Sequence, residues 1–163
     1  MNKTGQVLMF ISLILWGTLI GGVMYSHLVY FPPYLSRLPE SNSLITGPFG
    51  IQDGHFWMLL HPAMILTLLL TLLANWKLET RRKYILITMS IYALAIISTF
   101  CYFVPELKAF ADSMHSTIPA NEWYQRGQTW QHLSWVRGSF MYLGFVFLLI
   151  ALTKVDSSSD IPY

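Results

Sequence analysis

The chain has 163 residues, of which 54% are hydrophobic and 11% are charged, and ten Lys and Arg against eight Asp and Glu give a net charge of +2. Soluble domains carry about 25% charged residues, and a soluble monomer of this size could not hide so much apolar surface from water. The charged residues form no basic stripe that could bind a nucleic acid. The single cysteine, Cys101, excludes an intramolecular disulfide. The composition therefore predicts an all-α membrane protein.

Four apolar segments, each nearly free of charged residues, are predicted to cross the membrane as helices. They comprise residues 7–31, 55–76, 84–105 and 132–153. The first is longer than the ~20 residues that a helix needs to cross about 30 Å of hydrocarbon. Because it lacks a convincing cleavage site, it is predicted to be a retained helix rather than a signal peptide.

The fourth segment is less clean than the other three. Its uncharged part is residues 138–153, which is sixteen residues and reaches about 24 Å. A helix that crosses the membrane must therefore extend back through Arg137 and His132. We expect Asn121 or Thr117 to cap the extended helix.

The placement of Lys and Arg predicts the orientation. The short loop between the second and third segments carries four basic residues, Lys77, Arg81, Arg82 and Lys83. Cytoplasmic loops carry an excess of basic residues, so this loop and both termini are predicted to lie in the cytoplasm. The sequence thus predicts a multi-pass protein of the inner (cytoplasmic) membrane, folded over residues 1–163 as one antiparallel four-helix bundle in contact with the lipid bilayer.

A small-residue motif marks the first helix. Gly17 and Gly21 are four residues apart and therefore lie on one helix face. Small residues at this spacing let two membrane helices pack closely. The motif leaves open whether the partner is another helix of the same chain or a second copy in a homo-oligomer.

Ionisable side chains gather at the outward end of the predicted bundle. Four histidines reach this level from three of the helices: His27, His55, His61 and His132. Glu106 ends the third helix on the same side, and Arg137 follows His132 on the fourth. Ionisable residues inside a membrane usually mark function or a paired structural contact, so we expect a polar site at this end.

The histidines suggest a metal or haem site, because histidine is the usual ligand of transition metals and of haem iron. His55 and His61 are six residues apart and point about 120° apart on a helix, so the deeper His61 is favoured as the inward residue. The predicted metal ligands are His27, His61 and His132, with His55 and Glu106 as further candidates. Two histidines suffice for haem b, with Arg137 near a propionate, whereas three with a carboxylate suit iron, copper or zinc.

Glu106, Arg137 and Tyr102 are the catalytic candidates. Thr99, Tyr102 and Glu106 are spaced three and four residues apart, so they form a polar stripe on one face of the third helix. Glu106 could act as a ligand or proton acceptor. A structural ion pair between Glu106 and Arg137 is the simpler interpretation of these two residues.

Three short motifs resemble a known family. They are Val29-Tyr30-Phe31-Pro32 after a glycine-bearing first helix, Phe103-Val104-Pro105 at the end of the third helix, and Leu133-Ser134-Trp135-Val136-Arg137 at the start of the fourth. In this layout the chain resembles the anthrone-oxygenase-like family of small four-span membrane proteins. The resemblance implies a four-helix membrane fold and redox chemistry on a lipophilic substrate.

Three functions fit these features. The leading one is an integral membrane oxidoreductase-type protein that acts on a lipophilic small molecule or an oxygen species through a haem or metal site. The second is a cofactor-free membrane oxygenase, in which a histidine takes a proton from an acidic lipophilic substrate. The third is a non-enzymatic accessory or transport subunit of a membrane complex. The sequence does not decide whether the chain is an enzyme.

Overall fold

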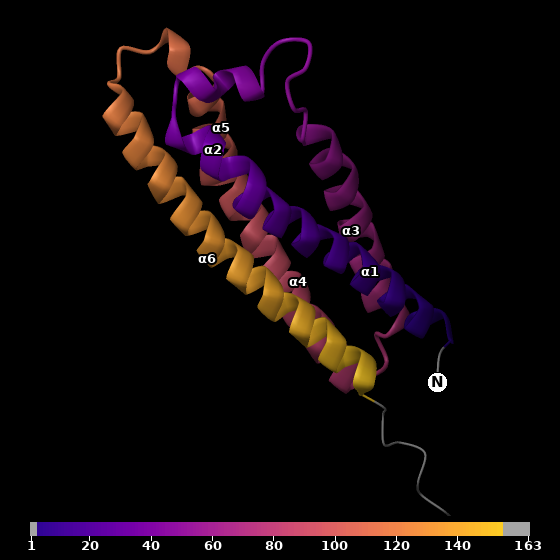
Figure 1. Cartoon of the computed structure of the whole chain (residues 1–163). Coiled ribbons are helices and arrows are strands. Elements are labelled where there is room, and N and C mark those ends of the chain that lie inside the picture. Colours follow the sequence, from indigo (N-terminus) through magenta and orange to yellow (C-terminus); the bar gives the residue numbers. More distant parts are fainter. Residues whose placement is uncertain (1–2, 155–163) are drawn as a thin grey trace, which may run out of the picture.

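The computed structural model describes residues 3–154, most of which lie in four long helical spans (Figure 1). The first and third spans each contain two α-helices joined by a π-helical turn: α1 (Lys3–Tyr25), η1 (Ser26–Tyr30) and α2 (Phe31–Ser36), then α4 (Glu79–Ser98), η3 (Thr99–Phe103) and α5 (Val104–Ala111). The other two are α3 (Gly54–Ala74) and α6 (Ala120–Thr153), and short 3-10 turns, η2 (Glu40–Leu44) and η4 (Ser113–His115), lie in the loops. Residues 3–154 contain no strand, so the predicted all-α fold is confirmed.

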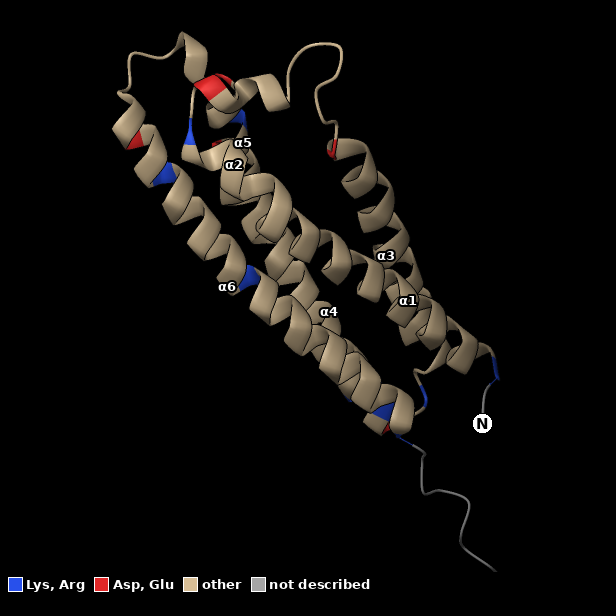
Figure 2. Ribbon diagram, in the orientation of Figure 1, with Lys and Arg blue, Asp and Glu red and all other residues tan. Residues whose placement is uncertain are grey.

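The spans run antiparallel in a four-helix bundle (Figure 1). α1 packs chiefly on α3, α4 packs on α6, and contact between α1 and α6 joins the two pairs. We call the end formed by α2, α5 and the loops beside them the upper end, and the end formed by the α3–α4 loop and the start of α1 the lower end. Lys, Arg, Asp and Glu lie mostly at these two ends (Figure 2). Each span is long and apolar enough to cross a membrane, as expected of a multi-pass membrane protein.

Three of the four spans are longer than the uncharged segments that predicted them. The observed spans are Lys3–Ser36, Gly54–Ala74, Glu79–Ala111 and Ala120–Thr153. The prediction that Asn121 or Thr117 caps the last helix is wrong, because the N-cap is Pro119 and no side chain caps it. Pro119 has an extended backbone (φ −65°, ψ 150°), and a proline there fixes φ without removing a hydrogen bond that the helix needs. Asn121 instead lies inside the first turn.

Both π-helical turns come directly before prolines, and the prolines explain them. Proline has no N–H, so Pro32, Pro33 and Pro105 cannot donate the hydrogen bonds that continue an α-helix. The chain accommodates this with one wider turn in each span: the N–H of Phe31 bonds the carbonyl of Ser26, and that of Val104 bonds the carbonyl of Thr99. Such π-bulges occur frequently at functional sites.

The core of the lower and middle bundle is packed around Trp16. This side chain is fully buried among apolar residues of all four spans, and its Nε1 donates a hydrogen bond of 3.0 Å to the carbonyl of Met141. Ser12 and Thr71 add a buried hydroxyl pair between α1 and α3 at 3.0 Å. These contacts fix the depth of three helices relative to one another.

Asn75 and Arg81 close the lower end. Asn75 is 0% exposed, and its Nδ2 donates to the carbonyls of Thr71 at 2.8 Å and Gly5 at 3.3 Å. Arg81 is 2% exposed, and it donates from Nη1 to Asn75 Oδ1 at 3.4 Å and from Nε to the carbonyl of Lys154 at 2.7 Å. Arg81, in the first turn of α4, is therefore buried rather than solvated, and together with Asn75 it joins Gly5 and Lys154, near the two ends of the described chain.

Gly17 and Gly21 lie on an exposed face of α1, and a Cβ added at either position would meet no atom within 4 Å. They are therefore not packed against any helix of the described chain. The predicted contact with a second copy stays a prediction.

Candidate functional site

A cavity of about 550 Å³ lies in the upper half of the bundle, between the first span, α3, the third span and α6. Ligand pockets for small molecules typically have volumes of roughly 300–1,000 Å³. Most of the wall is apolar, and the polar side chains that line it are Ser26, His27, Asp53, His61, Tyr92, Thr99 and Arg137. The two π-helical turns supply His27 from one side and Thr99 from the other.

His27 is more deeply buried than His61, the other histidine in this wall, and only 2% of its surface is exposed. Its Nδ1 lies 2.8 Å from the carbonyl oxygen of Val23. Because a carbonyl only accepts, Nδ1 must carry the proton, and Nε2 of the neutral ring is then an acceptor. Nε2 is buried and has no hydrogen-bond partner within residues 3–154. The His27 ring packs against the rings of Trp135, Phe31 and Trp130, with distances between ring centroids of 4.8, 5.6 and 6.3 Å.

His61 faces the same cavity from α3. Its Nδ1 lies 2.7 Å from the hydroxyl of Tyr92 on α4, and its ring stacks on Trp57 at 5.8 Å between centroids. His55, six residues earlier, is exposed and does not line the cavity. The preference for His61 over His55 as the inward residue therefore agrees with the structure.

Arg137 is the cation of the cavity. It donates from Nη1 to Thr99 Oγ1 at 2.7 Å and from Nη2 to Ser134 Oγ at 2.9 Å, and its guanidinium carbon lies 3.8 Å from the centre of the Phe103 ring. No carboxylate within residues 3–154 forms an ion pair with it. Arg137 lies sixteen residues (153 − 137) before the end of α6, which is about 24 Å along the helix. A guanidinium that lies within a candidate membrane span and has no counter-ion in this part of the chain is the strongest electrostatic feature of the site.

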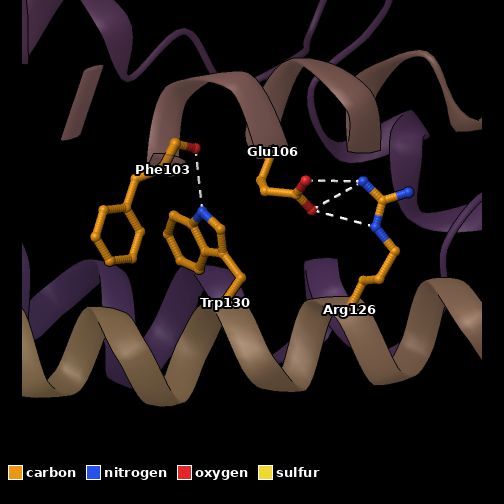
Figure 3. A network of polar contacts seen from close by, with 4 residues as sticks. All are labelled: Phe103, Glu106, Arg126 and Trp130. Carbon is orange, nitrogen blue, oxygen red and sulfur yellow. Dashed lines mark hydrogen bonds and ion pairs between the residues drawn. The ribbon is translucent and has the colours of Figure 1, made fainter. Parts of the chain in front are cut away.

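The predicted ion pair between Glu106 and Arg137 is wrong, because Glu106 pairs with Arg126 (Figure 3). Nε and Nη2 of Arg126 donate hydrogen bonds to the Glu106 carboxylate oxygens, at distances from 2.8 to 3.2 Å. The reason is the length of α6, which extends upward to Ala120 and brings Arg126 beside α5. Next to this pair, Trp130 Nε1 donates to the carbonyl of Phe103 at 3.1 Å (Figure 3). Glu106 does not line the cavity.

The third predicted histidine ligand, His132, is exposed on α6 and does not line the cavity. The buried face of this part of α6 runs through Trp130, Ser134 and Gly138, and His132 lies off that face. The structure therefore brings His27 and His61 to one cavity but not His132, His55 or Glu106. Residues 3–154 hold no group of three or more His, Cys, Asp or Glu side chains that could bind a metal ion.

Tyr102, a predicted catalytic residue, is half-buried and lies against Phe103 outside the cavity lining. Three polar residues of the lining were not predicted, namely Ser26, Asp53 and Tyr92. Asp53 precedes α3 and accepts a hydrogen bond of 3.2 Å from Trp57 Nε1. Tyr92 is seven residues before Thr99 and so shares its helix face. The position of Tyr92, two helical turns before Thr99, is the sequence signal that could have predicted its place in the cavity wall.

Comparison with known proteins yields no relative: no family model, curated protein or solved structure matches the chain. The resemblance to the anthrone-oxygenase-like family therefore stays a prediction. The function is argued below from the geometry of the cavity.

Proposed function

We propose that this chain is a membrane protein that binds a lipophilic small molecule in the cavity between the four spans, and that His27 accepts a proton or a hydrogen bond from it. The observation that carries the proposal is the unpaired, buried Nε2 of His27 beside a cavity of about 550 Å³. Buried polar atoms in folded proteins are almost always hydrogen-bonded, so an unpaired one requires an explanation. A ligand with a hydroxyl or N–H group would supply the missing donor.

The same residues suit acid–base chemistry on the ligand. A neutral imidazole can act as a general base towards a proton within hydrogen-bond reach. Arg137 in the same wall would offset the negative charge left on the ligand, and it would act strongly because the surroundings are apolar. Oxidation of such an anion by dioxygen would make the protein a cofactor-free membrane oxygenase. Binding is the first requirement of this activity.

A lipophilic nitrophenol, with a dodecyl tail, tests the binding step. Trp57 and Trp130 line the cavity, so a bound nitrophenol should quench tryptophan fluorescence of the protein in lipid nanodiscs. Loss of one hydrogen bond at His27 costs about 1.4 kcal/mol, so His27→Gln and His27→Ala should bind about tenfold more weakly. His115→Ala is the control, because His115 is exposed in η4. Equal affinities for all variants, or no saturable quenching, would refute the proposal.

A metal or haem site is the second candidate, and one observation favours it. Histidines that bind metals usually donate their other ring N–H to a carbonyl or carboxylate, as His27 Nδ1 does to Val23. His27 and His61 are the residues that would hold haem b, and Arg137 would offset the negative charge of a propionate. Iron, copper or zinc would need a further donor, and residues 3–154 hold no group of three His, Cys, Asp or Glu side chains that could supply it, so haem is the better fit. A bound group would supply electron transfer or oxygen activation, and the protein would then be an oxidoreductase.

An absorption spectrum and elemental analysis of the purified protein separate the two candidates. A Soret band, or a stoichiometric metal that is lost in His27→Ala and His61→Ala but kept in His115→Ala, supports the second candidate. A colourless, metal-free protein that binds the nitrophenol supports the first.

The orientation of the cavity forms part of the proposal. Four basic residues at the lower end, Lys77, Arg81, Arg82 and Lys83, favour a cytoplasmic lower end in the inner membrane, so the cavity would lie in the outward half of the bilayer. A cysteine introduced at Ser43, which is exposed beside the upper end, should react with an impermeant maleimide in intact cells in a Cys101→Ser background. Reaction only after the cells are opened would reverse this orientation.

A further inference from the structure

We infer that the cavity is filled from the bilayer, through a slot between α3 and the third span, by a single-tailed amphiphile whose anionic headgroup binds Arg137. This inference rests on the proposed function, for which it names a ligand class and a route. It is carried by the residues at the mouth of the cavity and by the missing counter-ion of Arg137.

One side of the slot is a stripe along α3. Gly54, Met58, Pro62 and Ile65 all line the cavity and are all exposed, with 66% of Met58 and 43% of Ile65 accessible. Their spacings of four, four and three residues place them on one helix face. From Gly54 to Ile65 the stripe extends over eleven residue steps (65 − 54), which is about 16 Å along the helix. A residue that lines a cavity and is also exposed lies at its opening.

The third span supplies the other side of the slot with the same spacing. Ile96, Phe100, Val104 and Leu107 line the cavity, Phe100 is 68% exposed, and the other three are half-buried. α3 packs mainly on α1, with much less contact to α4. The opening therefore runs lengthwise between two membrane-spanning helices and is bordered by apolar side chains, so it faces lipid chains. A molecule dissolved in the bilayer can reach the cavity without crossing water.

Arg137 defines the headgroup. Two of its five N–H groups are used by Thr99 and Ser134. A buried charge without a partner is strongly unfavourable, and a carboxylate or phosphate is the planar or branched acceptor that guanidinium binds best. Asp53 lines the cavity but forms no ion pair with Arg137. The volume of about 550 Å³ is that of a small-ligand site, so the cavity would hold the headgroup and the first part of one chain, and the rest of that chain would leave through the slot.

Electron paramagnetic resonance with spin-labelled stearic acid tests the headgroup, using its methyl ester as the neutral probe. In nanodiscs of zwitterionic lipid, the acid should give an immobilised component at about tenfold lower concentration than the ester, since one charge-assisted contact is worth about that factor. Arg137→Gln should abolish the difference and Arg137→Lys should keep it. Arg37→Gln removes a positive charge from an exposed position and should change nothing. Dodecyl phosphate should displace the labelled acid, whereas acetate and inorganic phosphate should not.

The position of the spin label tests the route. A label near the carboxyl end should be shielded from both dissolved oxygen and a water-soluble nickel complex. A label near the methyl end should stay accessible to oxygen, because the tail leaves through the slot into the bilayer. Ala95→Phe is a second variant, which fills the wall of the cavity at a buried position. It should remove the immobilised component of both probes, even if Arg137→Gln does not fold.

The outcomes distinguish this inference from the proposed function. Equal immobilisation of acid and ester, both lost in Ala95→Phe, would overturn the anionic headgroup and leave small-molecule binding intact. A methyl-end label that is as shielded as the carboxyl-end label would overturn the lateral route. Failure of the nitrophenol to bind would overturn the proposed function itself.

Discussion

Replacing Asn75 by Leu should destabilise the lower end of the bundle, because one buried amide joins three parts of the chain. Leu has a similar shape but no polar atoms. The substitution leaves the carbonyl of Gly5 without the 3.3 Å donor and Nη1 of Arg81 without the 3.4 Å acceptor. Each buried group that loses its partner costs about 1–3 kcal/mol. Both contacts are long, so the lower value applies to each, and the sum is about 2 kcal/mol.

Reversible unfolding in mixed detergent micelles, followed by tryptophan fluorescence, measures this change in the free energy of unfolding. Asn121→Leu is the matched control, because Asn121 is exposed near the start of α6, and its effect should stay within about 0.5 kcal/mol. An unfolding free energy for Asn75→Leu that equals that of the control would refute the account of the lower end.

A double substitution gives a stricter test of the same contact. A Cβ at Gly5 would lie 2.9 Å from Asn75 Oδ1, which is too close for that atom to remain, and 3.0 Å from Nδ2, which is a tight contact. Gly5→Ala should therefore destabilise the wild-type protein by about 1–3 kcal/mol. In an Asn75→Ala background the colliding atoms are gone, and the same substitution should cost much less. Additive effects would show that Asn75 does not contact Gly5.

Two further substitutions test the packing of the spans and the position of Glu106. A Cβ at Gly144 would lie 2.6 Å from the buried ring of Trp16, so Gly144→Ala should lower the free energy of unfolding by about 1–3 kcal/mol. Gly21→Ala should leave the free energy of unfolding unchanged, because a Cβ there would meet open space. The same detergent titration measures both variants, and equal values would contradict the packing. Glu106→Gln should lower the free energy of unfolding by only about 1 kcal/mol, because the ion pair of Glu106 with Arg126 is partly exposed to solvent. It should leave the affinity for the nitrophenol unchanged, and a tenfold weaker affinity would instead place Glu106 in the site.

The fold could be predicted because its main cause is visible in the sequence. Long runs without charge leave only helices that satisfy their own backbone hydrogen bonds in lipid. Some ends of the spans were predicted less well, because a helix continues past the hydrocarbon core into polar residues, as at the start of α4 at Glu79, where composition no longer marks it. The π-helical turns were not predicted, although Pro32 and Pro105 in apolar runs were a usable signal.

The candidate site could be predicted only in part. His27, His61 and Arg137 meet at one cavity, as their shared level in the membrane suggested. His132 lies at the same level but on the wrong face of α6. In a membrane helix both the buried face and the lipid-facing side are apolar, so periodicity does not show which side is inward. The sequence predicted that the last helix starts near Asn121, but it did not show that this start places Arg126, rather than Arg137, beside Glu106.

The most direct test of the central claim is nitrogen-15 NMR of the histidine side chains in nanodiscs, with and without the dodecyl-tailed nitrophenol. The account predicts that His27 carries its proton on Nδ1 and that the Nε2 resonance, assigned with His27→Gln, moves when the probe binds. A proton on Nε2 in the free protein, or an Nε2 resonance that is unchanged while the probe is bound, would contradict it.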